Sequence, residues 1–178
     1  LAAVLAQGGS KVLLIDGDIR RGYLHNMMNA DNTKGLADYL AGTSGNDDYH
    51  EFVQSGYIEN LHFMPRGTSA PNPAELLMHT RMTQLMEKSA QEFDYVLVDT
   101  PPILAVTDPA IVGRYAGTTL LVARFGMTPV KEMMYTIKRF EQNGIDVKGA
   151  ILNSVERKAS SYYGYGYNYH YGYTYKSE

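Results

Sequence analysis

Cysteine is absent from the 178 residues of this chain, which excludes disulfide bonds, iron–sulfur clusters and thiolate chemistry. The same absence fits a reducing compartment. The five histidines are scattered and no His-x-x-x-His pair occurs, so the sequence does not favour a zinc site. No apolar run approaches the roughly 20 residues that a membrane span requires, and no signal peptide is recognisable.

Positive charge is not in excess either, because 16 Lys and Arg stand against 19 Asp and Glu, a formal net charge of −3. Without a global basic field we expect no nucleic-acid partner. The length fits one domain, since a chain of this size buries about 70% of its unfolded surface without staples. The sequence begins at Leu1, inside an apolar-periodic stretch, and we expect it to be a fragment of a longer protein.

Apolar runs of strand length alternate with stretches of helical periodicity. The alternation is typical of βαβ units and predicts an α/β fold, a parallel sheet with helices on both faces. Residues 17–34 and 67–73 are expected to be loops, and Pro73 is placed to open the next helix. We expect strands at residues 11–16, 61–65, 94–99, 118–124 and 147–153. We expect helices at residues 1–7, 35–42, 47–54, 73–92, 108–116 and 129–143.

Three acids stand where predicted strands end. Asp16 and Asp18 bracket a glycine after the strand at 11–16, and Asp99 ends the strand at 94–99. Ligands of open parallel sheets bind beyond the carboxyl ends of the strands, and carboxylates that converge there suit Mg²⁺. Acids at strand ends can also merely cap loops or helices. The apolar strand followed by an acid occurs twice, which favours a site.

Two further polar positions stay open between two interpretations. Arg20 and Arg21 follow Asp18 within one turn; they could stabilise charge on a transferred phosphoryl group, or be solvated loop cations. Asn153 ends the last predicted strand, where it could hydrogen-bond a purine edge or simply form a turn.

The composition changes abruptly near residue 157, which predicts a domain over residues 1–157 and a flexible tail over 158–178. The last nineteen residues hold eight tyrosines and no Leu, Ile, Val, Phe or Met. Without aliphatic side chains to bury, such a segment does not offset the roughly 1–2 kcal/mol per residue that ordering costs. The tyrosines are Tyr162, Tyr163, Tyr165, Tyr167, Tyr169, Tyr171, Tyr173 and Tyr175.

A row of exposed hydroxyls beside a nucleotide site suggests a phosphorylation substrate carried by its own kinase. The alternative is an aromatic low-complexity segment for adhesion or carbohydrate binding. No phosphate loop of the form G-x-x-x-x-G-K-[ST] occurs in the sequence, and neither do the H-R-D, D-F-G or A-P-E signatures of eukaryotic-type kinases.

The order of five motifs and the tyrosine tail resembles the bacterial tyrosine kinases (BY-kinases), the cytoplasmic domains of Wzc-like proteins that control capsule and exopolysaccharide export. The resemblance covers essentially the whole chain. The motifs are VLLIDGDIRRG (12–22), GTSAPNPAELL (67–77), DYVLVDTPPILAVTD (94–108), LLVARFG (120–126) and VKGAILN (147–153).

The resemblance implies a P-loop NTPase fold of the deviant-Walker class that uses ATP and Mg²⁺. It makes Asp16 and Asp18 catalytic, Mg²⁺-linked acids of a Walker A-prime strand, and Asp99 the Walker B acid near Mg²⁺. We assign Arg20 and Asn153 to ATP binding, the latter to adenine by position only. The tail becomes an autophosphorylation cluster.

The resemblance also implies an inner-membrane protein anchored by upstream helices, whose cytoplasmic domains form a homo-oligomeric ring. One subunit's tail would enter its neighbour's site, a low-molecular-weight tyrosine phosphatase would reset it, and the polysaccharide export machinery would be the partner. The missing phosphate loop departs from the family pattern. Two alternatives remain: a partitioning or septum-placement ATPase of the same fold, and a non-catalytic oligomeric scaffold.

Overall fold

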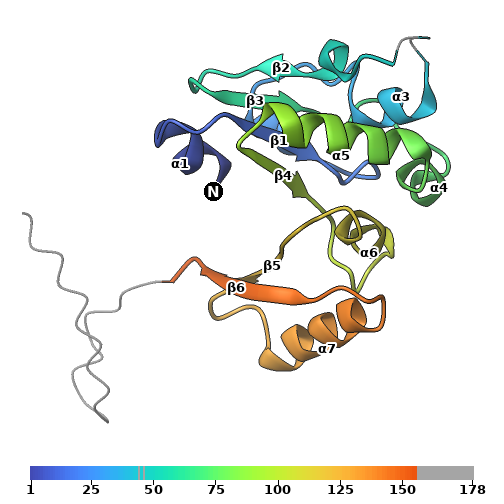
Figure 1. Cartoon of the computed structure of the whole chain (residues 1–178). Helices are drawn as coiled ribbons and strands as arrows, with labels where there is room; N and C mark the ends of the chain where they lie inside the picture. The colour runs from blue at the N-terminus through green and yellow to red at the C-terminus, as the bar shows by residue number, and fades with distance from the viewer. Residues whose placement is uncertain (44, 46, 156–178) are drawn as a thin grey trace, which may run out of the picture.

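A computed structural model describes residues 1–43, 45 and 47–155. It confirms an α/β fold (Figure 1). The strands are β1 Val12–Asp16, β2 Gln54–Ser55, β3 Leu61–Met64, β4 Tyr95–Asp99, β5 Thr119–Arg124 and β6 Val147–Asn153. The helices are α1 Ala2–Gln7, α2 Leu24–Met27, α3 Leu36–Ala41, α4 Pro73–Leu77, α5 Thr80–Glu92, α6 Asp108–Gly113 and α7 Val130–Glu141, with a 3-10 helix, η1, at Tyr49–Phe52.

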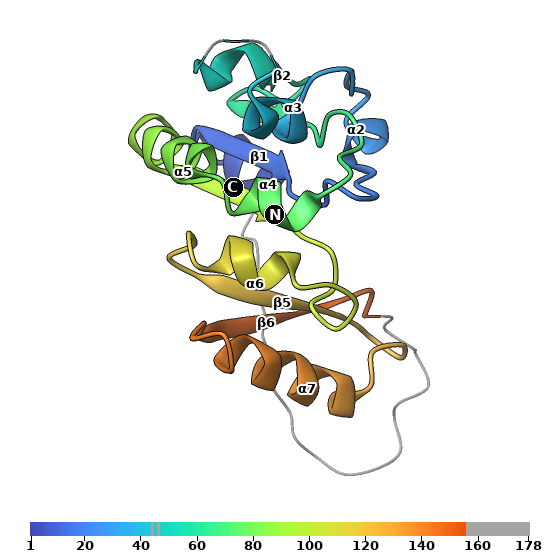
Figure 2. The same ribbon diagram turned by 90° about the vertical axis from the view of Figure 1, so that its right-hand side faces the viewer.

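The described strands form two sheets instead of the single one expected. The first sheet has the order β2-β3-β1-β4, in which β1 runs parallel to β3 and β4, while the short β2 is antiparallel to β3. The second sheet pairs β5 with β6 in parallel. Figures 1 and 2 show the two sheets one above the other. Within the described residues, β4 and β5 are therefore each hydrogen-bonded along one edge only.

Strand β1 is buried on both faces, as its continuous apolar run predicts. Leu13 and Ile15 point into the larger core, which helices α3 and α5 help to close. Val12 and Leu14 lie on the opposite face, in the cluster that includes the α1 residue Ala6. The carboxyl end of β1 is thereby held in a fixed place in the middle of the first sheet.

Helix α6 belongs to both halves of the molecule. Its Ala110 packs in the smaller core with Leu121 of β5 and Phe140 of α7, whereas its Val112 packs in the larger core of the first sheet. Figure 2 shows α6 between α4 of the first half and β5 of the second sheet. The position of α6 is consequently set by packing on two sides.

Several expected boundaries were wrong. The helix expected over 73–92 is two helices, because extended His79 interrupts it and caps α5 by accepting the Arg81 amide at 3.2 Å. The loop expected over 17–34 contains α2, and the segment 47–54 forms η1 and the start of β2. No helix in the described residues is both long enough and apolar enough to cross a membrane.

Candidate active site

Strands β1 and β4 end side by side, and their last residues are two of the predicted acids. Asp16 and Asp99 are register partners in the parallel pairing. The Gly17 amide then donates to the Asp99 carbonyl at 2.8 Å, which holds the two chains together past the strands. A Cβ at Gly17 would lie 2.7 Å from that carbonyl and 2.8 Å from a Val98 methyl, so a side chain does not fit there.

The Asp16 carboxyl is fully buried. Its Oδ2 accepts the Leu24 amide at 3.2 Å, while its Oδ1 has no hydrogen-bond partner within the described residues. Burial raises the pKa of Asp16 to about 6, and the negative charges of Asp99 and Asp18 add to the rise. This carboxyl therefore changes its protonation state just below neutral pH.

Asp18 lies in the turn after β1 and shapes it. Its Oδ1 accepts the amides of Arg20 at 3.2 Å and Arg21 at 2.9 Å. The pKa of Asp99 is raised by partial desolvation and by the charge of Asp18. The three acids that the sequence singled out thus form one electrostatically coupled group.

The donor set fits Mg²⁺. Carboxylate oxygens are the ligands that this ion prefers, and it takes one or two of them together with water and phosphate oxygens. The unpartnered Oδ1 of Asp16 and the mutual repulsion among the acids are both relieved by a nearby cation. In the part of the chain that the structure describes, no three His, Cys, Asp or Glu side chains are arranged to hold a metal by themselves.

Arg20 is engaged in a contact that the sequence did not reveal. Its Nε donates to Oδ2 of Asp108 at 2.6 Å and its Nη2 donates to Oδ1 at 3.0 Å. Asp108 is fully buried at the start of α6. The only sequence signal was its place at the end of the family motif over 94–108. The assignment of Arg20 to ATP binding remains a prediction, and its guanidinium is already paired.

Asn153 ends β6 in the second sheet. Its carbonyl accepts the Phe125 amide at 2.9 Å, and its side-chain oxygen accepts the Ser154 amide at 2.9 Å. No hydrogen bond within the described residues joins it to the three acids. Its role in adenine binding stays a prediction, as do the roles of the eight tyrosines, which lie outside the described residues.

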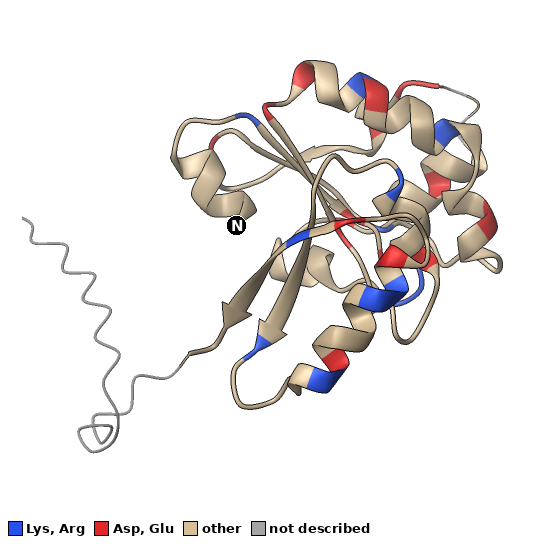
Figure 3. Cartoon of the chain, turned by 60° about the horizontal axis from the view of Figure 1, so that its bottom comes forward, with Lys and Arg blue, Asp and Glu red and all other residues tan. Residues whose placement is uncertain are grey.

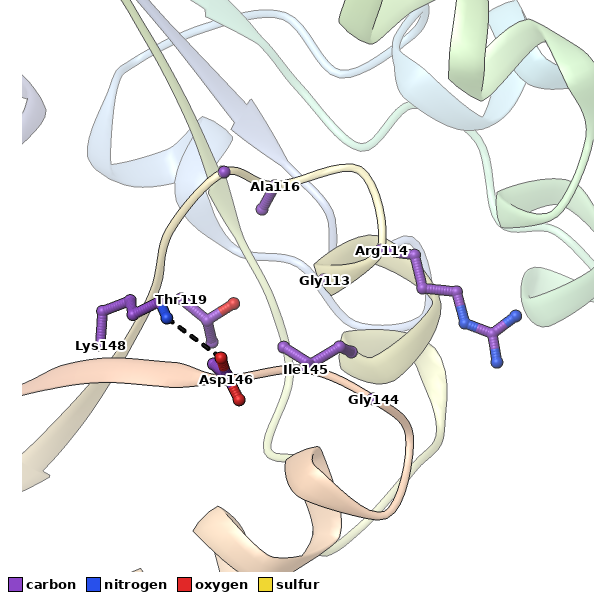
Figure 4. Close-up of a pocket in the computed structure, with 9 residues that line it drawn as sticks. Gly113, Arg114, Ala116, Thr119, Gly144, Ile145, Asp146 and Lys148 are labelled. Carbon is purple, nitrogen blue, oxygen red and sulfur yellow. Dashed lines mark hydrogen bonds and ion pairs between the residues drawn. The ribbon is translucent and has the colours of Figure 1, made fainter.

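A cavity of about 310 Å³ lies at the opposite end of the second sheet from Asn153 (Figure 4). Thr119 at the start of β5 and Gly144 before β6 line it, and its Lys148 is bonded to Asp146 at 3.1 Å. Figure 3 shows acidic and basic positions interspersed along the described helices. Neither the cavity nor the charge distribution gives a reason to place the candidate site elsewhere than at the strand ends that carry the acids.

The chain is similar in sequence to known proteins over most of its length. A family model described as "AAA domain" matches residues 1–148. A putative tyrosine-protein kinase in the cps region of Klebsiella pneumoniae is 49% identical over 164 residues, 92% of this chain and 22% of that protein. Tyrosine-protein kinase etk of Escherichia coli K12 is 51% identical over 163 residues, again 92% and 22%. The chain thus spans about a fifth of the length of these relatives.

Solved structures show the same likeness. The kinase domain of Escherichia coli tyrosine kinase ETK superposes with a TM-score of 0.85 at 51% identity, covering 95% of this chain and 65% of that one. A plasmid partition protein from Borrelia burgdorferi gives a TM-score of 0.67 at 15% identity, covering 90% and 74%. The second likeness, at that identity, concerns the fold alone.

Proposed function

The chain belongs to the AAA-domain family and, within it, to the bacterial tyrosine kinases of the Wzc and Etk type, and from this premise we propose an activity. The whole protein transfers the γ-phosphoryl group of ATP to tyrosines of its own C-terminal segment. The observation that carries the proposal is the pairing of Asp16 with Asp99 at adjacent strand ends, with Asp18 electrostatically coupled to both.

Asp16 is our candidate for orienting and deprotonating the attacking tyrosine hydroxyl. A phenol of pKa near 10 supplies little phenolate at neutral pH, so a carboxylate that accepts the proton as the bond forms is useful. The pKa of about 6 suits this role, because the group is mostly ionised at pH 7 yet more basic than an ordinary aspartate. The buried position also keeps its charge poorly screened by water.

Asp18 and Asp99 would hold Mg²⁺. When bound, the ion neutralises charge on the phosphate groups and helps to place them. The amides of Arg20 and Arg21 keep the Asp18 carboxylate directed within its turn. The described acids therefore supply one side of an ATP site.

The other side requires a phosphate-binding loop, which the 178 residues do not contain. The relatives are much longer than this chain, so the loop would come from a neighbouring part of the full-length protein. Among the described residues, β4 and β5 each have one edge without a strand partner, to which another strand would add. Leu120 and Val122 of β5, 44% and 67% exposed, share one face of the second sheet, and a further segment packed on that face would cover them.

We propose that transfer occurs between subunits of a ring-like homo-oligomer. A flexible segment of about 15 residues spans roughly 20 Å on average, enough to leave its own domain. Tethering gives an effective concentration of order mM, so weak recognition of any one tyrosine suffices and several can serve in turn. Each phosphate would add a charge of about −1.5 to −2, which would make crowded tails repel each other.

The biological role we propose is regulation of capsule and exopolysaccharide synthesis and export. The relative from a cps region and the Wzc-like relatives support it. The protein would act as the cytoplasmic domain of a bacterial inner-membrane protein, with the export machinery as partner and a low-molecular-weight tyrosine phosphatase as its reset.

Incubation of the full-length protein with MgATP, followed by phosphotyrosine mapping, tests the activity. Phosphate on the tail is the expected result. ATP hydrolysis without tail modification would instead indicate a partitioning-type ATPase, and neither reaction a scaffold. The partition-protein likeness carries the fold and gives no observation in favour of that second function.

A further inference from the structure

The Arg20–Asp108 pair joins two segments that are 88 positions apart in the sequence. Its two nearly parallel hydrogen bonds, 2.6 and 3.0 Å long, fix the plane of the guanidinium as well as its position. The Asp108 side chain is fully buried and that of Arg20 is 38% exposed. A buried carboxylate that loses its basic partner is strongly disfavoured, so the pair should persist whenever the domain is folded.

Arg20 is coupled through its backbone to one of the site acids. Its own amide donates to Asp18 Oδ1, and the guanidinium at the other end of the residue is anchored on Asp108. Rotation of the Asp18 carboxylate would break its hydrogen bonds to the amides of Arg20 and Arg21. The direction of the Asp18 carboxylate therefore depends on the anchor.

Asp108 is a rigid anchor. It is the first residue of α6, and α6 is packed in both hydrophobic cores through Ala110 and Val112. The chain from Asp99 runs directly into α6 through residues 100–107. The loop after Asp99 therefore also ends at Asp108.

A closed circuit of contacts results. It runs from Asp99 to Gly17 through a 2.8 Å backbone hydrogen bond, along the turn to Asp18 and Arg20, across the ion pair to Asp108, and back along the chain to Asp99. These contacts add a restraint on the positions of Asp18 and Asp99 beyond the pairing of β1 with β4.

We infer that Arg20 and Asp108 are positioning residues for phosphoryl transfer, which set the spacing between the Asp18 and Asp99 carboxylates. The inference rests on the proposed kinase activity. It replaces a direct contact of Arg20 with ATP by an indirect effect on the carboxylates that hold Mg²⁺. Positioning of this kind is valuable because small displacements of catalytic groups lower rates strongly.

The test uses the full-length protein and compares Arg20→Gln, Asp108→Asn and the double variant with the wild type. Each single variant should lower kcat for tail phosphorylation at least tenfold and raise the Mg²⁺ concentration for half-maximal rate at least threefold. The KM for ATP at saturating Mg²⁺ should change less than threefold. The double variant should have a kcat no lower than that of the less active single variant, because both changes break the same contact.

Two exposed charged residues outside this circuit of contacts serve as controls. Arg114→Gln removes an exposed arginine from the other end of α6, and Asp146→Asn removes an exposed aspartate at the start of β6. Both should keep rate and Mg²⁺ requirement within twofold of the wild type. Arg20→Lys keeps the charge but cannot form two parallel bonds, so it should fold and give an intermediate Mg²⁺ requirement.

A structural role alone would lower the melting temperature and leave the Mg²⁺ requirement of the folded fraction unchanged, which would overturn the inference. A large rise in KM for ATP with Arg20→Gln but not with Asp108→Asn would overturn it too, in favour of direct nucleotide contact. If the wild type shows no tail phosphorylation, the proposed function fails. The role of the Arg20–Asp108 pair can then still be tested by Mg²⁺-dependent ADP binding. Arg20→Gln and Asp108→Asn should both raise the Mg²⁺ concentration required for half-maximal binding.

Discussion

Asp16 and Asp99 occupy partnered positions at the ends of two parallel strands, and the backbone hydrogen bond from Gly17 to Asp99 locks their chains together beyond the sheet. The two acids differ in environment, since Asp16 is fully buried while Asp99 is exposed to solvent. This difference is the basis of the roles that we propose: the buried acid as proton acceptor and the exposed acid as a ligand of a hydrated ion.

Replacement of Asp99 tests its role at the metal. Asp99→Ala should reduce tail phosphorylation at least a hundredfold, because one of two proposed Mg²⁺ ligands is lost, while circular dichroism and melting temperature stay close to wild type. Asp94→Ala is the control, since Asp94 is an exposed acid just before the same strand, and its carboxylate accepts the Lys11 amide at 2.7 Å. Retained labelling in Asp99→Ala would remove that residue from the site.

The Asp16 carboxyl makes stability depend on pH. Its folded pKa of about 6 lies above the unfolded value of 3.8, so the folded state binds the proton more tightly. The associated stability is complete below pH 3.8 and is lost as the pH rises through 6. Asp16→Asn should therefore stabilise the domain at pH 7.5 by up to roughly 3 kcal/mol more than at pH 4.

Urea denaturation of the wild type and Asp16→Asn at both pH values measures this difference. Phosphorylation should be lost in the same variant, and the wild-type rate should rise with pH through about 6. A difference in unfolding free energy that is independent of pH would show that Asp16 titrates normally.

The absence of a side chain at Gly22 provides the space that the Asp16 carboxyl occupies. A Cβ at Gly22 would collide with both carboxyl oxygens and come within 2.6 Å of the Asp16 Cγ, and the Gly22 carbonyl also accepts the Arg66 Nε at 3.0 Å. Gly22→Ala should displace Asp16, lower phosphorylation at least tenfold and cost about 1–3 kcal/mol in stability.

Gly117→Ala is the matched control, because a Cβ at Gly117 meets no atom within 4 Å. It should keep full activity. Chemical denaturation measures the stability of each variant. NMR titration measures the pKa of Asp16, which reports whether its carboxyl is displaced. Equal activity of the two variants would contradict the crowding at Gly22.

His50 links η1 to the end of α5. Its Nδ1 lies 2.6 Å from Asp48 and its Nε2 lies 2.8 Å from Glu92, and hydrogen bonds to these two carboxylates raise its pKa. A raised histidine pKa gives stability that is present below pH 6.5 and lost as the pH rises through the folded value.

The effect should be small, about 0.5 kcal/mol, because the His50 side chain is 51% exposed and water screens the pair. His50→Gln should lower stability at pH 5.5 and have less effect at pH 9. Thermal melts at the two pH values measure it. A loss that is equal at both would assign it to packing on Tyr49, whose ring stacks on His50 at 4.2 Å.

The sequence was sufficient to predict the parts of the fold that follow from continuous apolar runs. The strands around Leu13, Leu97, Leu121 and Ile151 lie where expected, and so do the acids at two of their ends. The break between α4 and α5 was not predictable from periodicity, since the apolar pattern continues through it and a histidine supplies the cap.

Long-range pairing was not predictable either. Nothing in the local sequence around Arg20 indicates that its partner lies at the start of α6, because that contact depends on how α6 packs between two cores. The division into two sheets depends in the same way on which strands are present to pair. Local patterns predict elements, and tertiary packing decides their neighbours.

Transfer from one subunit's site to another's tail is the central claim, and one mixing experiment tests it most directly. The first variant is the full-length protein without residues 158–178, which keeps the site and lacks the tyrosine cluster. It is mixed with the Asp99→Ala variant, which keeps the tail, and MgATP is added. Phosphate on the tyrosines between 162 and 175 of the Asp99→Ala protein is the expected result. ATP turnover by the truncated protein with both chains unmodified would contradict it.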